Sequence, residues 1–152
     1  MRMTINHLNI VVANMQRSLD FYVGLLGMRQ TFAVMLQDRW LEEVTGCDDA
    51  RAHCVFVVPD GGGCRLELLQ YLSPEGTALL PNTLPHTQGL RHFALEVTDL
   101  DGWYQKLSAV GVRFVSPPVT VPFRIVEGIQ KRLCYCHDPD GVIVEFCEHL
   151  RS

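Results

Sequence analysis

The stretch INHLNIVVANMQRSLDFYVGLLG, residues 5–27, decides the fold, because a second stretch of the chain repeats its pattern. Residues 90–111 read LRHFALEVTDLDGWYQKLSAVG. In each stretch, alternating apolar residues predict a strand with a histidine near its start, and a capped helix that ends in glycine follows. We expect the first helix to run from Met15 to about Leu26. A repeat of this kind indicates two duplicated structural units.

Each copy is closed by a strand that carries one glutamate. Glu67 lies in RLELLQ, 60 residues after His7, and Glu145 lies in VIVEFCE, 53 residues after His92. The intervening apolar runs and glycine-rich or proline-rich turns predict further strands. The predicted order is β-α-β-β-β, a linker, and β-α-β-β-β again, which is an α+β fold.

The layout of the chain follows from that order. We expect a single domain with a first module at residues 1–72, a linker at 73–89 and a second module at 90–152. In the second module, strands are expected at 112–115 and within 123–136, with a proline-rich loop between them. A chain of 152 residues has the length of one compact domain or of two small repeats around one core.

Composition excludes several classes of protein. A net charge of −4 with no basic run argues against nucleic acid as a partner, and no apolar stretch has the length of a membrane span. The start of the chain, MRMTINH, has no apolar signal region, so we expect a cytoplasmic protein. The six cysteines lie mostly in strand-like apolar runs and are expected to be reduced.

Strand parity tests whether the repeated histidines and glutamates can meet. Successive side chains of a strand point to opposite faces, so His7 and His92 lie opposite the apolar residues that pack under the helices. Glu67 and Glu145 alternate with apolar neighbours in the same way. All four candidates therefore lie on the face away from the helices, and a curved sheet would gather them on its concave side.

Two imidazoles and two carboxylates are a ligand set for one divalent cation. Such a set is open to Zn²⁺, Ni²⁺, Fe²⁺, Mn²⁺ or Co²⁺. Two glutamates that face one pocket repel each other, and a cation between them removes that conflict. We therefore predict one metal site formed by His7, Glu67, His92 and Glu145.

The chain resembles the vicinal oxygen chelate superfamily, which includes glyoxalase I, methylmalonyl-CoA epimerase, extradiol dioxygenases, and fosfomycin and bleomycin resistance proteins. The resemblance rests on INHLNIVVANMQRSLDFYVGLLGM, GLRHFALEVTDLDGWYQKLSAVGV and DPDGVIVEF, and it covers essentially the whole chain. It implies paired βαβββ modules that form an open, barrel-like cup around a metal. Members close this cup within one chain or across a homodimer, and both arrangements stay open here.

The ligand pattern is similar to that of bacterial glyoxalase I, a lactoylglutathione lyase with His-Glu-His-Glu at these positions. The resemblance then implies a lyase or isomerase reaction on a small molecule through a metal-stabilised enediolate. Glu145 matches the position of the family's catalytic base, and Glu67 is the second candidate for that role. Glyoxalase I usually carries an arginine where Val11 stands, so the use of glutathione stays open.

Other members of the superfamily give alternative functions. Epimerases show a linker similar to LSPEG…GLRHFALEV, but they often have glutamine at the position of Glu67. Iron-dependent dioxygenases use a triad that His7, His92 and Glu145 would satisfy. A drug-binding resistance protein without catalysis is the remaining alternative, although such members often lack the ligands.

Three further residues are candidates for contact with a substrate. Trp40 and Phe123 are expected in loops near the mouth of the cup, where their aromatic rings would line an apolar pocket. Arg124 is a candidate for binding an anionic group. Trp103 lies on the second predicted helix and is expected to pack against the core.

Overall fold

The computed structural model describes residues 3–78, 84–124 and 126–151. The chain divides into two compact units, Met1–Ala78 and Leu79–Ser152. The boundary falls inside the segment 73–89 that the sequence predicts as a linker, of which residues 79–83 lie outside the described part. In the described part of the chain, no helix has the length and hydrophobicity needed to cross a membrane.

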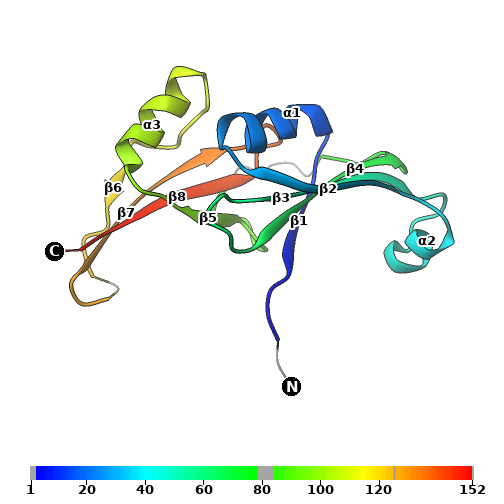
Figure 1. Cartoon of the computed structure of the whole chain (residues 1–152), viewed down its shortest axis with the longest axis horizontal. Coiled ribbons are helices and arrows are strands. Elements are labelled where there is room, and N and C mark those ends of the chain that lie inside the picture. Colours follow the sequence, from blue (N-terminus) through cyan, green and yellow to red (C-terminus); the bar gives the residue numbers. More distant parts are fainter. Residues whose placement is uncertain (1–2, 79–83, 125, 152) are drawn as a thin grey trace. The chain divides into compact units, whose positions relative to one another are not determined.

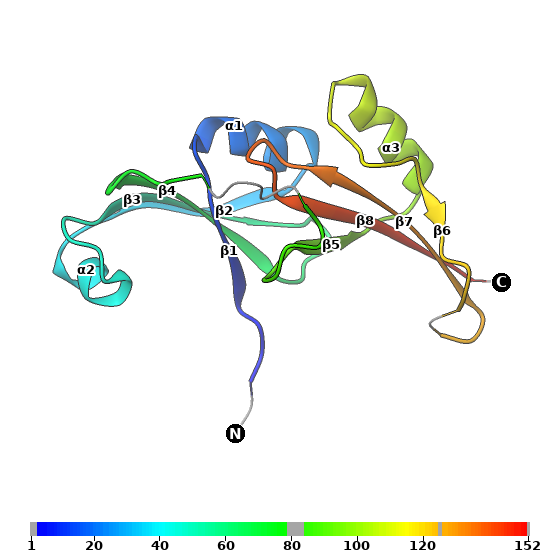
Figure 2. The same cartoon turned by 180° about the vertical axis from the view of Figure 1, so that it is seen from behind.

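The first module contains one four-stranded sheet with a helical segment on one face (Figures 1 and 2). The strand order is β1-β4-β3-β2, with β1 and β4 parallel and the other neighbours antiparallel. A short helix, α2, follows β2 and precedes β3. The elements are β1 (His7–Val11), α1 (Met15–Leu19), η1 (Asp20–Leu25), β2 (Arg29–Leu36), α2 (Arg39–Thr45), β3 (Arg51–Val58) and β4 (Arg65–Ser73).

The second module repeats this topology with the order β5-β8-β7-β6. Here β5 and β8 are parallel, and β7 pairs antiparallel with both β8 and β6. Neither sheet closes into a barrel by itself, because its two outer strands are not paired with each other. The elements are β5 (His92–Glu96), α3 (Leu100–Ala109), β6 (Val119–Thr120), β7 (Ile129–His137) and β8 (Ile143–Arg151).

Both helical segments begin and end as the sequence predicts. The side chains of Asn14 and Asp99 accept hydrogen bonds from the backbone N–H of Arg17 and Gly102, at 2.9 and 3.0 Å. These bonds satisfy donors that the first turn of a helix leaves unpaired. The terminating glycines, Gly27 and Gly111, have φ angles of 72° and 87°, a conformation that favours glycine.

The first helical segment is not one regular α-helix. It is α-helical only over Met15–Leu19 and continues as a π-helix over Asp20–Leu25. A π-helical turn holds more residues than an α-helical turn and usually appears as a local bulge inside a helix. The buried side chains are Met15 and Ser18 in the α-helical part and Phe21 and Tyr22 in the π-helical part.

One predicted strand of the second module is wrong. Residues 112–115 form no strand; Phe114 makes only an isolated bridge to Cys136. The edge strand is instead the two-residue β6, which lies in the stretch expected to be a proline-rich loop. Pro117 and Pro118 explain the shift, because proline lacks the N–H that a continuous ladder requires. Residues 123, 124 and 126–128 are likewise outside any strand.

The helix-facing side of each sheet carries the core. In the first module, Tyr22, Leu68 and Val57 are fully buried. In the second, Leu107 and Phe146 are buried, and the ring of Trp103 packs on Phe146 with centroids 5.8 Å apart, as expected for a packing residue. Burial of these apolar groups fixes which face of each strand points away from the helices, and the candidate ligands are on that other face.

Candidate metal centre

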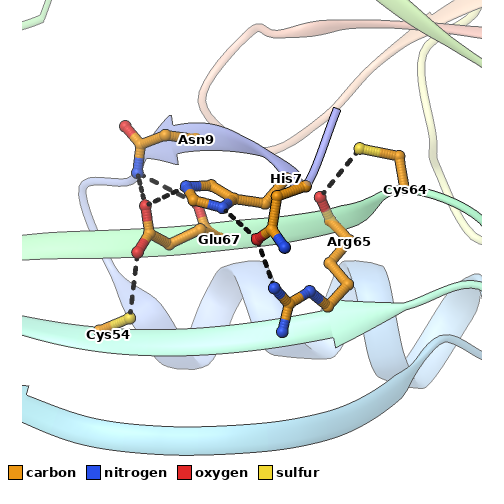
Figure 3. A network of polar contacts seen from close by, with 7 residues as sticks. His7, Asn9, Cys54, Cys64, Arg65 and Glu67 are labelled. Atoms are coloured by element: carbon orange, nitrogen blue, oxygen red, sulfur yellow. Dashed lines mark hydrogen bonds and ion pairs between the residues drawn. The ribbon is translucent and has the colours of Figure 1, made fainter. Parts of the chain in front are cut away.

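The first module brings His7 and Glu67 together at the start of the parallel strand pair (Figure 3). The imidazole Nε2 of His7 lies 3.5 Å from Oε2 of Glu67. The two side chains come from neighbouring strands, β1 and β4, and both point away from the helical face. The side chain of Glu67 is 17% exposed and that of His7 is 38% exposed, so the pair lies at an accessible surface.

A polar neighbour orients the imidazole of His7. Its Nδ1 is 2.9 Å from Oδ1 of Asn6, which also accepts a hydrogen bond from Arg65. A carbonyl oxygen only accepts, so in the neutral ring the hydrogen on Nδ1 leaves the lone pair on Nε2, the nitrogen that faces Glu67. In the neutral imidazole this lone pair faces a carboxylate oxygen. A positive charge at that point, a proton or a metal ion, removes the repulsion, which fits a ligand role for His7.

Glu67 is held by two donors without formal charge. Asn9 donates from Nδ2 to Oε2 of Glu67 at 3.1 Å, and the thiol of Cys54 lies 3.7 Å from Oε1 (Figure 3). Burial, and secondarily the charge of Glu67, raise the pKa of Cys54 to about 12. The thiol therefore stays protonated at neutral pH and remains a donor to the carboxylate.

The second module contains a matching histidine–glutamate pair, but different residues contact its glutamate. Nε2 of His92 lies 3.2 Å from Oε2 of Glu145, and the Glu145 side chain is only 5% exposed. Its other oxygen, Oε1, lies 2.6 Å from Nζ of Lys131. The hydrogen bond to Glu145 raises the pKa of Lys131, so this is an ion pair at neutral pH.

An aromatic ring accompanies each histidine at the same register. Phe56 on β3 lies opposite Glu67, and Tyr135 on β7 lies opposite Glu145. The ring centroids of His7 and Phe56 are 5.5 Å apart, and those of His92 and Tyr135 are 5.2 Å apart. These contacts restrict how each imidazole can turn, and they leave Nε2 directed at its glutamate.

Neither module alone completes a metal site. Within the described residues of each module, no group of three or more His, Cys, Asp or Glu side chains is close enough to hold an ion. Each module instead supplies one imidazole and one carboxylate side by side. Two such pairs make the four-ligand set that suits a divalent cation of intermediate hardness, so the donor chemistry fits the group.

The three predicted substrate contacts lie outside both pairs. Trp40 is part of α2 rather than a loop, and its side chain is half exposed. Phe123 and Arg124 are exposed and lie between β6 and β7. None of the polar or aromatic contacts described for the two pairs involves them, and a role in binding stays a prediction.

Sequence reasoning missed the neighbours that support the glutamates. Asn9 and Cys54 contact Glu67, and Lys131 contacts Glu145. A further pair, His149 and Glu96, lies at 2.9 Å on the same strand face of the second module. Lys131 offered one signal: by strand parity it shares a face with the apolar residues Leu133 and Tyr135.

Comparison with known proteins identifies the family of the chain. The Glyoxalase/Bleomycin resistance protein/Dioxygenase superfamily matches residues 4–146, so the chain belongs to this superfamily. A lactoylglutathione lyase of Pseudomonas aeruginosa is 27% identical over 154 residues, covering 94% of this chain and 81% of the relative.

Solved structures share the fold. A glyoxalase family protein from Bacillus cereus superposes with a TM-score of 0.84 at 22% identity, covering 99% of this chain and 96% of the other. The fosfomycin resistance protein FosX from Mesorhizobium loti gives a TM-score of 0.56 at 16% identity, covering 96% and 91% of the two chains. At these identities the likeness concerns the fold and leaves the reaction undefined.

Proposed function

We propose that this chain is a metal-dependent lyase or isomerase of the glyoxalase type, which acts on a small molecule through an enediolate. The observation that supports it is the repeated contact between a histidine Nε2 and a glutamate Oε2, at 3.5 Å in one module and 3.2 Å in the other. A binding protein without catalysis has no need of two carboxylates beside two imidazoles. The lactoylglutathione lyase relative supports the same class.

The four proposed ligands divide the work between binding and proton transfer. A bound divalent cation supplies Lewis-acid polarisation of two neighbouring substrate oxygens, which acidifies the adjacent carbon. Glu145 would loosen from the metal, take the proton from that carbon and return it to the neighbouring one, and Glu67 is the second candidate for this role. His7 and His92 remain as fixed nitrogen ligands, each oriented by its aromatic neighbour.

The arginine that contacts glutathione in glyoxalase I has no counterpart here, and the use of glutathione stays open. Val11 occupies that position here, on the same strand face as His7, and it is 49% exposed. We therefore propose a substrate whose contact at this point is apolar. In accord with the free state of all six cysteines, we place the activity in the cytoplasm.

Metal content and hemithioacetal isomerisation test the proposal. Purified protein is loaded with Zn²⁺, Ni²⁺, Co²⁺, Mn²⁺ or Fe²⁺ in turn, and bound metal is measured after gel filtration. We expect one ion per candidate site and isomerisation of methylglyoxal hemithioacetals that stops on addition of a chelator. A protein that retains no stoichiometric ion in any of the five preparations contradicts the proposal.

An epimerase-like isomerase is the second candidate, because the linker segment resembles that of methylmalonyl-CoA epimerases. It shares the proton transfer next to a carbonyl, so exchange of a substrate proton with deuterated water detects it even where hemithioacetals are inert. Oxygen consumption with a catechol would instead indicate the dioxygenase chemistry of the superfamily. Tight binding of a drug such as fosfomycin without turnover would indicate a resistance protein.

We also propose that the chain forms a homodimer. Two inactive double variants test where the site assembles: His7→Ala with Glu67→Ala, and His92→Ala with Glu145→Ala. If each site combines the first module of one subunit with the second module of its partner, a mixed dimer contains one intact site and recovers metal binding. If the site forms within one chain, every site in the mixture is damaged and nothing is recovered.

A further inference from the structure

Lys131 is the most closely held cation next to the candidate metal ligands. Its Nζ lies 2.6 Å from Oε1 of Glu145, and the two side chains are 19% and 5% exposed. The next residue, Arg132, points to the opposite face of β7 and pairs with Asp101 at 2.7 Å. The strand therefore directs one cation to the site and one away from it, as the alternation of side chains requires.

The lysine is not required by the fold, because the first module lacks it. Tyr135 and Phe56 occupy matching positions, since each lies opposite the glutamate of its own module. Four residues before Phe56 stands Ala52, and four residues before Tyr135 stands Lys131. Ala52 is fully buried in an apolar cluster with Cys54 and Leu69. The second module thus has a charge where the first has a methyl group.

The two carboxylate oxygens of Glu145 have different partners. Oε1 is taken by Lys131, while Oε2 lies 3.2 Å from Nε2 of His92. We propose that Lys131 is a positioning residue that acts as a built-in counter-ion: it directs Oε2 of Glu145 toward the cation and makes the bound cation easier to release. This inference rests on the proposed metal site.

The sign of the effect on affinity follows from charge. Lys131 attracts Glu145 both before and after a metal ion binds, so that attraction largely cancels in the binding free energy. Repulsion between the ammonium and a divalent cation exists only in the loaded protein. Lys131 therefore weakens metal binding, and its removal strengthens it. In the metal-free protein, Lys131 neutralises the charge of the buried Glu145 carboxylate.

Zn²⁺ affinity, measured by competition with a chromophoric chelator at pH 7, tests the inference. We expect Lys131→Met to bind Zn²⁺ about tenfold more tightly than the natural protein. Lys131→Arg retains the charge and is expected to stay within about twofold. Arg132→Met is the matched control, because it removes the same charge one residue away on the opposite face, and it is expected to leave the affinity unchanged.

Metal-free stability gives an independent measurement. Lys131→Met leaves Glu145 buried without its cationic partner, so the melting temperature in chelator is expected to fall by about 5 °C. Saturating Zn²⁺ is expected to raise the melting temperature of this variant by more than it raises that of the natural protein. Lys131→Gln, which keeps a hydrogen-bond donor without charge, serves if the methionine variant does not fold.

The outcomes separate the two proposals. Unchanged or weaker Zn²⁺ binding in the folded Lys131→Met or Lys131→Gln variant overturns the role of Lys131 while the metal site stands. Equal tightening in Arg132→Met overturns it as well, because the effect would then be one of overall charge. Absence of Zn²⁺ binding in the natural protein overturns the proposed function, and the inference with it.

Discussion

The two modules have the same pairing register at their candidate ligands but differ in what surrounds them. In each, a histidine at the start of the first strand meets a glutamate on the parallel strand beside it, and an aromatic residue lies across from that glutamate. In the first module neutral groups support the carboxylate; in the second, an ammonium group does. The comparison shows that the repeat retained the pair while its environment diverged.

The divergence extends along the whole strand face. Val11 and Tyr71 of the first module stand where the second has Glu96 and His149, each counted along the strand from its own histidine or glutamate. The first face carries a buried apolar cluster around Cys54. The second has a hollow of about 490 Å³ lined by Glu96, Val126, Ile129, Lys131, His149 and Arg151. Beyond the ligand pairs, the first face is thus mainly apolar, and the second carries additional charged side chains.

Removing either ligand pair is expected to have the largest effect, and it tests whether the two modules contribute equally. His7→Ala with Glu67→Ala, or His92→Ala with Glu145→Ala, should each reduce divalent metal affinity by at least about 100-fold, because half of the ligands are lost. Isothermal titration with Zn²⁺ measures this. His86→Ala, an exposed histidine outside the strands, is the control. A loss confined to one pair would show that a single module binds the ion.

Asn9→Ala tests whether the glutamates of the two modules depend on different neighbouring residues. Asn9 donates to Glu67 at 3.1 Å, whereas the matching residue opposite Glu145 is Ala94. Loss of this orienting hydrogen bond is expected to weaken metal binding by roughly 10-fold, in the range found for groups that hold a metal ligand. The reverse change, Ala94→Asn, should have little effect, because Lys131 already holds Glu145. Equal effects of both changes would contradict this view of the asymmetry.

Replacing the glycine that ends each helical segment with alanine compares the stability of the two helix ends. Gly27 and Gly111 both have positive φ, and an added Cβ would meet nothing within 4 Å at either position. The strain of the left-handed conformation alone should therefore destabilise each variant by roughly 1–2 kcal/mol, which urea unfolding measures. Gly24→Ala, at a glycine with equally open surroundings and no positive φ, is the control and should be neutral or slightly stabilising.

The reactivity of the cysteine thiols also differs between the modules, and this is the smallest of the expected effects. The first has one buried cysteine, Cys54, and the second has three: Cys134, Cys136 and Cys147. Burial is the main cause that raises the pKa of Cys54 and of Cys136 to about 12 and that of Cys134 to about 11. At pH 8 a disulfide reagent should react quickly only with the two half-buried thiols, at Cys47 and Cys64.

The same shifts give a pH dependence of stability. A thiol whose pKa is raised by folding contributes stability that is fully present below its unfolded pKa, about 8.5, and is lost as pH rises toward the folded value. The melting temperature should therefore decline above about pH 9. Cys136→Ser should reduce the decline more than Cys64→Ser does. An equal decline in both variants would show that other groups control it.

Much of the fold could be predicted from the sequence. Apolar residues follow the spacing of strands and of helices, and residues typical of helix ends bound both helical segments. Each helical segment has a side-chain cap at its start and ends in a glycine, as expected; the caps are Asn14 and Asp99, and the glycines are Gly27 and Gly111. Parity also placed each histidine on the face of its own glutamate. The ligand role of these four residues, and the closure of the two modules around one ion, stay predictions.

What could not be predicted depends on the pairing between strands. Asn9 supports Glu67 because β1 and β4 place them opposite each other, and a single sequence does not reveal that register. Lys131 reaches Glu145 across β7 and β8 for the same reason. The β6 strand was missed because two residues are too few for alternation to be recognised.

The π-helical turn at Asp20–Leu25 records a difference in length between the copies. Asn14 and Asp99 each follow their histidine by seven positions, but Gly27 follows Asn14 by 13 and Gly111 follows Asp99 by 12. A π-helical bulge is the form a helix takes when it absorbs a single extra residue. The extra residue is thus contained on the outer side of the sheet, where it left the spacing from histidine to cap untouched. The helical segment therefore absorbs the one-residue difference between the copies, and the two ligand pairs keep matching strand registers.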